Sequence, residues 1–239
     1  MSKRSVAIAT ASALALAALL AGCAAPSPTP TADASRSAKP TGSPTSSEVP
    51  RAADDQARDT ITSIVVRPEM LQLMDTNGAE VETISYDASA EQFVGMFTSL
   101  MKAEPAITEN PGGMESSPTT MYTWDGFELA DDHERDGGVS DMNVAVTFTK
   151  PQLGPRAITV ATIQGFKPGD DLRWLAKYMN EPFNEDADFN QIQAEHGAPI
   201  GDQLPGSPYS NSNSVTGQNL YQHEGSVVFA PWNFGIGHV

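Results

Sequence analysis

The chain has 239 residues, and its 14 Lys and Arg residues against 30 Asp and Glu residues give a formal net charge of −16 at pH 7. This acid excess argues against nucleic acid as a partner, because nucleic acids are bound by clustered Lys and Arg. The single cysteine excludes an intramolecular disulfide and a zinc site made of four cysteines.

The N-terminus has the features of an export signal. Lys3 and Arg4 give a basic start, and residues 6–20 form an uncharged run rich in Ala and Leu. A membrane-spanning helix needs about 20 apolar residues, so this run has the length of a secretory signal instead. It ends in the sequence Leu20-Ala21-Gly22-Cys23, and Cys23 is the single cysteine.

These four residues resemble the lipobox of bacterial lipoproteins. The resemblance implies that residues 1–22 are a lipoprotein signal peptide and that Cys23 carries diacylglycerol, typically with palmitate chains. Each buried CH₂ group contributes about 0.8 kcal/mol, so two or three chains give a stable membrane anchor. We therefore expect a protein attached to the cell membrane by lipid and facing outward. The alternative is an ordinary signal followed by a chance cysteine.

Residues 23–56 are predicted to be a disordered tether. They are rich in Pro, Ser, Thr and Ala, and Val49 is the only larger aliphatic residue among them. Such a segment buries too little apolar surface to offset the entropy cost of ordering it. Its composition is similar in style to the tethers of envelope lipoproteins from high-GC Gram-positive bacteria. Residues 57–239 would then form the extracytoplasmic domain.

The first half of this domain is predicted to contain three strands and a helix. Strands are expected at Ile64–Val66, Met70–Met74 and Val81–Tyr86, the last two joined by an Asn77-Gly78 turn.

The helix begins at Ser89, which forms a capping box with Gln92, and it is stopped by Pro105. Its apolar face has helical spacing and consists of Phe93, Met96, Phe97, Leu100 and Met101. Ser99 and Lys102 are expected on the exposed face, and Ile107–Thr119 is predicted to be a loop.

The second half begins with a strand or bent hairpin at Tyr122–Leu129. Alternating apolar residues predict half-buried strands at Val144–Phe148 and Ile158–Thr162, read as a hairpin. Gly169-Asp170 opens a second helix that Pro182 stops, and its apolar face is Leu172, Leu175, Ala176 and Met179.

The C-terminal part is predicted to begin with a short helix over Asp188–His196, which Gly197 caps. A polar loop over Gln203–Gly217 follows, and the last strands start at Tyr221 and include Val227–Phe229.

Together these elements predict an α+β fold, with an antiparallel sheet or sheets and two amphipathic helices. The two halves also resemble each other, which suggests a degenerate tandem strand–strand–helix–strand repeat. Glu104-Pro105 and Glu181-Pro182 follow the two helices, and Tyr122–Gly126 and Tyr221–Gly225 share the pattern Tyr-x-x-acid-Gly. The alternative is that hairpins and helices recur by chance.

Catalytic motifs are only weakly represented in the sequence. Ser99-Leu100-Met101-Lys102 matches the Ser-x-x-Lys pattern of penicillin-recognising enzymes, and Ser212-Asn213 loosely resembles their second motif. In that family the serine opens a helix, whereas Ser99 lies near the end of one, and no Lys-Thr-Gly follows. The polar face of an amphipathic helix is therefore the favoured interpretation.

Metal sites are also weakly supported. Two regions are crowded with acids and amides: Asp131, Asp132, Glu134, Asp136 and Asp141 in one, and Asn184, Glu185, Asp186, Asp188 and Asn190 in the other. A calcium loop starting at Asp186 would need Gly at its sixth position and Glu at its twelfth, but Gln191 and Gly197 stand there. His196, His223 and His238 are favoured as ordinary histidines over a zinc or copper site. We assign no metal and no cofactor.

The aromatic residues Trp124, Trp174, Trp232 and Phe234 could form a sugar-stacking surface, but core packing is the favoured role. The sequence therefore favours a non-enzymatic lipoprotein that binds a protein or cell-envelope component. One alternative is an envelope hydrolase whose site residues are far apart in sequence. A Ser, a His and an acid in one pocket would favour it. Another is a two-lobed substrate-binding lipoprotein that feeds a transporter.

Overall fold

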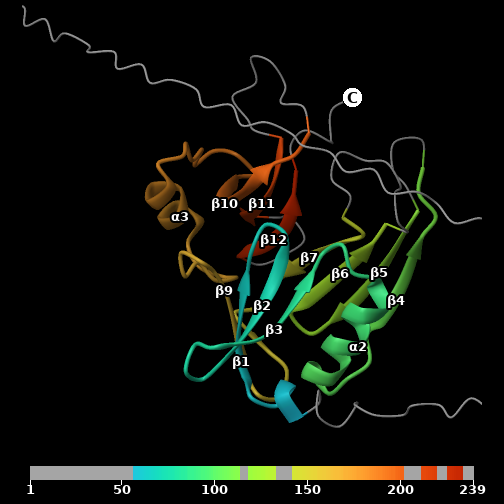
Figure 1. The fold of residues 1–239 in the computed structure, drawn as a ribbon. Helices are drawn as coiled ribbons and strands as arrows, with labels where there is room; N and C mark the ends of the chain where they lie inside the picture. Colours follow the sequence, from blue (N-terminus) through green and yellow to red (C-terminus); the bar gives the residue numbers. More distant parts are fainter. Residues whose placement is uncertain (1–55, 114–117, 133–141, 202–210, 220–224, 234–239) are drawn as a thin grey trace, which may run out of the picture. The chain divides into compact units, whose positions relative to one another are not determined.

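The computed structural model describes residues 56–113, 118–132, 142–201, 211–219 and 225–233 (Figure 1). All of these lie in one compact unit, Ser47–Val239. Cys23, the signal segment and the greater part of the tether lie outside the described residues, so the three expected segment boundaries stay predictions. In the part of the chain that is described, no helix is long and apolar enough to cross a membrane.

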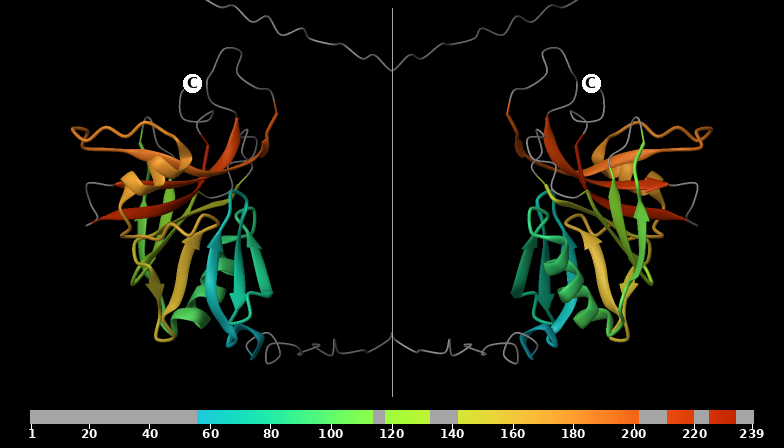
Figure 2. Two further views of the ribbon diagram at one scale, coloured as in Figure 1. Left: turned by 90° about the vertical axis from the view of Figure 1, so that its left-hand side faces the viewer. Right: turned by 90° about the vertical axis from the view of Figure 1, so that its right-hand side faces the viewer.

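A five-stranded sheet is built around the N-terminal meander. Its strands, from edge to edge, are β3 (Glu80–Ser85), β2 (Met70–Asp75), β1 (Ile61–Val66), β9 (Ile158–Thr162) and β8 (Gln152–Leu153). All neighbours are antiparallel except β1 and β9, which run parallel and lie side by side in both views of Figure 2. The expected Asn77-Gly78 turn joins β2 and β3, and Gly78 has the positive φ of 75° that this turn requires.

A seven-stranded antiparallel sheet contains the remaining strands. Its order is β10 (Gln191–Pro199), β11 (Ser212–Asn219), β12 (Ser226–Trp232), β7 (Val144–Phe148), β6 (Phe127–Asp131), β5 (Thr119–Trp124) and β4 (Ala106–Asn110). The edge strands are therefore β10 and β4. The α+β class with two amphipathic helices is confirmed, and the sheets are antiparallel apart from the pair of β1 and β9.

The helix α2 (Ala90–Met101) forms as predicted. Ser89 and Gln92 make both hydrogen bonds of the capping box, and all five residues of the expected apolar face are buried. Lys102 ends the helix in the left-handed conformation and is exposed, whereas Ser99 is half-buried. The helix α3 (Leu172–Met179) begins after Asp171, whose carboxylate accepts a hydrogen bond from the Arg173 N–H.

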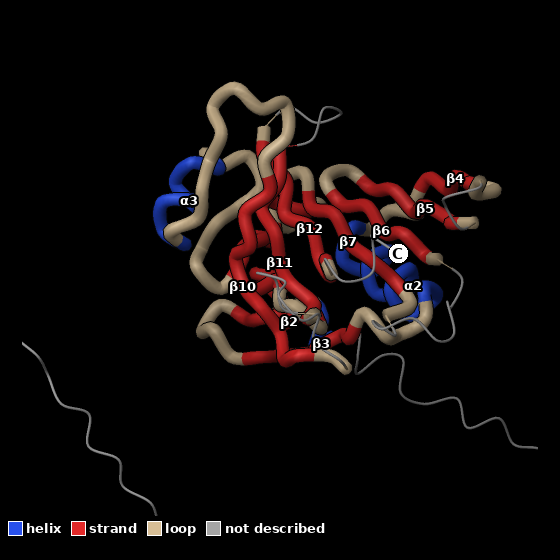
Figure 3. Tube along the Cα trace, turned by 90° about the horizontal axis from the view of Figure 1, so that it is seen from above, coloured by secondary structure: helices blue, strands red, loops and turns tan. Residues whose placement is uncertain are grey.

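Both helices pack on one face of the seven-stranded sheet. The register aligns Phe127 with Phe148, Phe148 with Val228 and Val228 with Gly217, and directly paired residues share a face. Phe97 of α2 stacks on Phe127. A Cβ atom placed on Gly217 would lie 2.8–2.9 Å from side-chain atoms of three residues, two of them on α3: Leu175, Phe166 and Leu172. Figure 3 shows α3 and α2 toward opposite ends of this sheet.

Three secondary-structure predictions are wrong. Ile107–Thr119 contains the edge strand β4, which is exposed along its whole length and so lacks the apolar alternation of a buried strand. Asp188–His196 is not a helix, because Ile192 and Ala194 alternate with polar residues and place β10 in the sheet. The expected loop Gln203–Gly217 contains most of β11, while residues 202–210 lie outside the described residues.

The structure does not show the predicted tandem repeat, because the strand order differs between the two halves. In the first half β2 and β3 form a hairpin, and the strand before α2 is the sheet edge. In the second half β7 and β9, expected to be a hairpin, lie in different sheets, and β9 before α3 is an interior strand. The remaining similarity is that β4–β7 and β10–β12 each form an antiparallel meander. Gly126 directly precedes β6 and Gly225 directly precedes β12, with φ of 91° and 89°.

Candidate functional site

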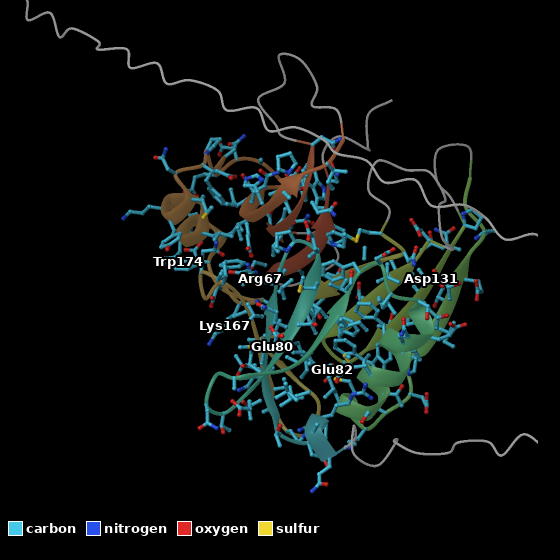
Figure 4. The ribbon with its side chains drawn as sticks, in the orientation of Figure 1. Arg67, Glu80, Glu82, Asp131, Lys167 and Trp174 are labelled. Carbon is cyan, nitrogen blue, oxygen red and sulfur yellow. The ribbon has the colours of Figure 1, made fainter. Side chains whose placement is uncertain are left out.

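A cavity of about 430 Å³ opens where the two sheets meet, and we call it the Arg67 pocket. It is lined by Arg67–Met70 and Gln72 from the five-stranded sheet and by Glu195–Ala198 of β10. The turn between β1 and β2 positions Arg67, which is labelled in Figure 4. The bulges in the β10–β11 pairing around Glu195 lie along the opposite wall.

A charge pair spans this pocket. The Arg67 guanidinium donates from Nε and Nη2 to the Glu195 carboxylate, at 2.9 Å and 2.7 Å to its two oxygens, and from Nη1 to Gln72 Oε1 at 2.9 Å. The hydrogen bond to Glu195 raises the pKa of Arg67 above its ordinary value. Both charges are therefore engaged with each other, and the pair connects the two sheets.

His196 lies beside this pair and contacts a serine. Its Nδ1 is 3.5 Å from Ser214 Oγ, at the outer limit of a hydrogen bond. Ser214 is buried on β11, whereas His196 is exposed. The acid adjacent in sequence, Glu195, is held by Arg67. The structure thus brings together a serine and a histidine, but the acid beside them is turned to a different partner.

Several residues that were weighed as metal ligands in the sequence fall outside the part of the chain that the structure describes. His223, His238, Glu134, Asp136 and Asp141 lie outside the described residues. In the described ranges no cluster of three His, Cys, Asp or Glu side chains could hold a metal ion.

In the second acidic region, side chains stabilise a local turn instead of forming a metal site. The Asn190 side chain accepts from the Asn184 N–H and donates to the Asn184 carbonyl, while Glu185 pairs with Arg173 at 3.4 Å.

The aromatic residues divide between core and surface. Trp124 is buried, as favoured, and its Nε1 donates to the Ala103 carbonyl at 2.9 Å. Trp174 is 43% exposed, so the core assignment is wrong for it, and its ring stacks between Phe166 and Tyr178. Trp232 is half-buried, and Phe234 lies outside the described residues.

A second cavity, of about 340 Å³, lies between the edge strand β3 and the helix α2, and we call it the β3–α2 groove. Glu82–Ser85 form one wall, and Glu91, Gln92, Gly95 and Met96 form the other. Arg58 closes one side by a bidentate pair with Glu82, with both N–O distances at 2.8 Å. The sequence interpretation missed this site. Its one available signal was Gly95, a glycine in the middle of an otherwise favourable helix.

Ser99 and Lys102 do not form a catalytic pair. The Lys102 ammonium instead lies 3.6 Å from the Asp59 carboxylate. Ser212 is buried on β11.

No protein-family model, curated protein or solved structure matches this chain. The function of the site is therefore inferred from its own residues.

Proposed function

We propose that this protein is a lipoprotein anchored to the outer face of the cell membrane through lipid on Cys23, and that its domain binds a protein or cell-envelope component. The observation that carries the proposal is the sequence Leu20-Ala21-Gly22-Cys23, which closes an apolar run with a basic start and contains the only cysteine of the chain. Residues 23–56 would hold the domain away from the membrane.

The two cavities support a binding role. The Arg67 pocket borders β10 and the β3–α2 groove borders β3, and both strands are sheet edges. Edge strands present main-chain groups that can pair with an extended polypeptide. The two-lobed transporter alternative has less support, because the buried apolar residues of both sheets, Val227 excepted, belong to one core cluster.

Replacement of Cys23 tests the anchor. Cys23→Ala removes the thiol that the lipid would occupy, so labelled palmitate should no longer be incorporated. The variant should be released into the medium or keep its signal segment. Ser27→Ala in the same segment is the matched control and should behave as the unaltered protein. A Cys23→Ala protein that is correctly cut and still membrane-bound would overturn the proposal.

The envelope hydrolase is kept as a second candidate because Ser214 contacts His196. A fluorophosphonate probe labels activated serines, and under this alternative Ser214→Ala should abolish labelling while Ser212→Ala should not. Labelling with that pattern would replace the binding role by an enzymatic one.

A further inference from the structure

We propose that the β3–α2 groove receives an extended peptide segment of a partner protein, which pairs with β3 as an additional strand and places a Lys or Arg opposite Glu91. This inference rests on the proposed binding role, but it does not depend on the lipid anchor. It assigns the binding to one of the two cavities and states the chemistry of the partner.

The register of the five-stranded sheet leaves main-chain groups of β3 without a partner strand among the described residues. The Arg67 N–H donates to the Met70 carbonyl, so the main chain of Met70 faces β1. Main-chain groups alternate along an antiparallel strand, so Leu71 faces β3 and its partner Ile84 faces back toward β2. Thr83, next to Ile84, therefore directs its N–H and C=O toward the free edge. Because Thr83 also lines the groove, these groups are placed where a peptide would pair.

The groove also offers an apolar surface. Ile84 of β3 and Met96 of α2 both line it, and Ala88 in the connection between the two elements adds a small side chain. A strand that pairs with β3 alternates its side chains between two faces. An apolar side chain from such a strand can then contact Ile84 and Met96 while its neighbours remain in solvent.

Neither a close contact with a described residue nor a positive φ accounts for the glycine at position 95. Glycine within a helix costs about 1 kcal/mol relative to alanine. A Cβ atom at Gly95 would meet nothing within 4 Å, whereas one at Gly126 would lie 2.8 Å from Lys150 Cβ. Gly95 also lacks the positive φ that explains Gly78. The missing side chain at Gly95 keeps the groove open along the wall that α2 forms.

The charges of the groove define the partner. The Glu82 carboxylate is neutralised by Arg58, with which it forms a bidentate pair. Glu91 is exposed in the first turn of α2 and forms no ion pair within the described residues. The whole chain carries a formal charge of −16. A segment with a Lys or Arg near Glu91 is therefore complementary both locally and overall.

Fluorescence anisotropy with the mature chain carrying Cys23→Ala tests the proposal. The probe is a labelled peptide of about six residues, the usual length of a strand, that alternates valine and lysine. Matched peptides carry serine or glutamate in place of lysine. We expect the lysine peptide to bind at least about tenfold more tightly than the serine peptide, and the glutamate peptide not to bind.

Two variants separate the groove from general charge attraction. Gly95→Leu fills the groove from a position where the fold leaves space, and Thr83→Pro removes an outward N–H that makes no bond to β2. Each should weaken binding of the lysine peptide by at least about tenfold. Circular dichroism should show both proteins folded. Thr83→Ala retains the N–H and should bind as the unaltered protein does.

Several results would overturn the inference. These are unchanged binding by Gly95→Leu, equal binding of the glutamate peptide, or a concentration-dependent dimer that Gly95→Leu abolishes in a protein that binds no peptide. The last would assign the groove to a second copy of this chain. Peptide affinity and the membrane attachment of Cys23→Ala are separate measurements, so failure of the inference is distinguishable from failure of the proposed function.

Discussion

Phe97 of α2 lies face to face with Phe127 of β6, with their ring centroids 3.8 Å apart and their planes inclined by 14°. Both side chains are fully buried. Phe97 also lies within 6.4 Å, centroid to centroid, of Phe93, Trp124 and Phe148. This one side chain therefore joins α2 to three neighbouring strands of the seven-stranded sheet, and it fixes the helix that forms one wall of the β3–α2 groove.

Replacing Phe97 by alanine should lower the free energy of unfolding by about 3–5 kcal/mol, because it removes a buried ring and leaves a cavity. Urea unfolding followed by tryptophan fluorescence measures this change. Phe97→Leu keeps most of the apolar volume and should cost clearly less. A Phe97→Ala variant as stable as the unaltered protein would contradict the packing described here.

Glycine replacements should have graded effects. Gly78→Ala places a side chain at a φ of 75° with free space around it, so it should cost only the backbone strain, about 1–2 kcal/mol. Gly126→Ala, at a φ of 91°, also brings a Cβ atom to 2.8 Å from Lys150 Cβ. Overpacking should add about 1–3 kcal/mol to the cost. Thermal unfolding of both variants checks this order, and equal destabilisation would contradict it.

Asp75 should contribute to the loss of stability in acid. The Ala79 N–H, followed by groups of Asn77, donates hydrogen bonds to the Asp75 carboxylate, and these hold its pKa below the ordinary value in the folded state. Its contribution is fully present above the pKa of the unfolded chain, about 3.9, and is lost as the pH falls through the lower folded pKa.

The Asp75→Asn variant cannot titrate at this position. Its melting temperature should therefore fall less steeply than that of the unaltered protein as the pH is lowered from about 5 to about 2. Asp186→Asn removes an exposed carboxylate for which no hydrogen bond is seen among the described residues, and it is the matched control. Parallel pH profiles for the unaltered protein and Asp75→Asn would show that the turn does not depend on this carboxylate.

The pair between Arg67 and Glu195 should stabilise the contact between the two sheets. A double-mutant cycle with Arg67→Ala and Glu195→Ala should give a coupling energy of about 1 kcal/mol, as expected for a partly exposed pair. Arg67→Lys should not restore the full coupling, because lysine cannot donate to both carboxylate oxygens as a planar guanidinium does. A coupling energy of zero would mean that this pair does not stabilise the contact between the two sheets.

The elements that the sequence predicted well are those whose signals are local. The capping box at Ser89, the apolar stripe that includes Phe97 and the Asn77-Gly78 turn all depend on residues within a few positions of each other. Local backbone preferences and the spacing of apolar residues are enough to predict such features. The expected lipid anchor at Cys23 also depends on a contiguous motif, and it stays a prediction.

The strands that the sequence missed gain their structure from distant partners. β11 contains Ser, Asn, Thr, Gly and Gln and has the composition of a loop, yet Ser212–Gln218 are buried. The backbone of β11 pairs with β10 on one side and with β12 on the other. Val215–Gly217 therefore lie in the interior of the sheet. β10 has only Ile192 and Ala194 in alternation, which is too short a pattern to identify a strand from the sequence.

The candidate sites were decided by the tertiary structure. Arg67 and Glu195 are separated by 128 positions and meet because β10 lies beside the turn between β1 and β2. The β3–α2 groove likewise exists because β3 is left at a sheet edge when β9 pairs with β1. The sequence by itself determined α2, α3 and the turn between β2 and β3, since each depends on neighbouring residues. Which charges face each other and which strand edge stays open depends on long-range pairing, which no local pattern encodes.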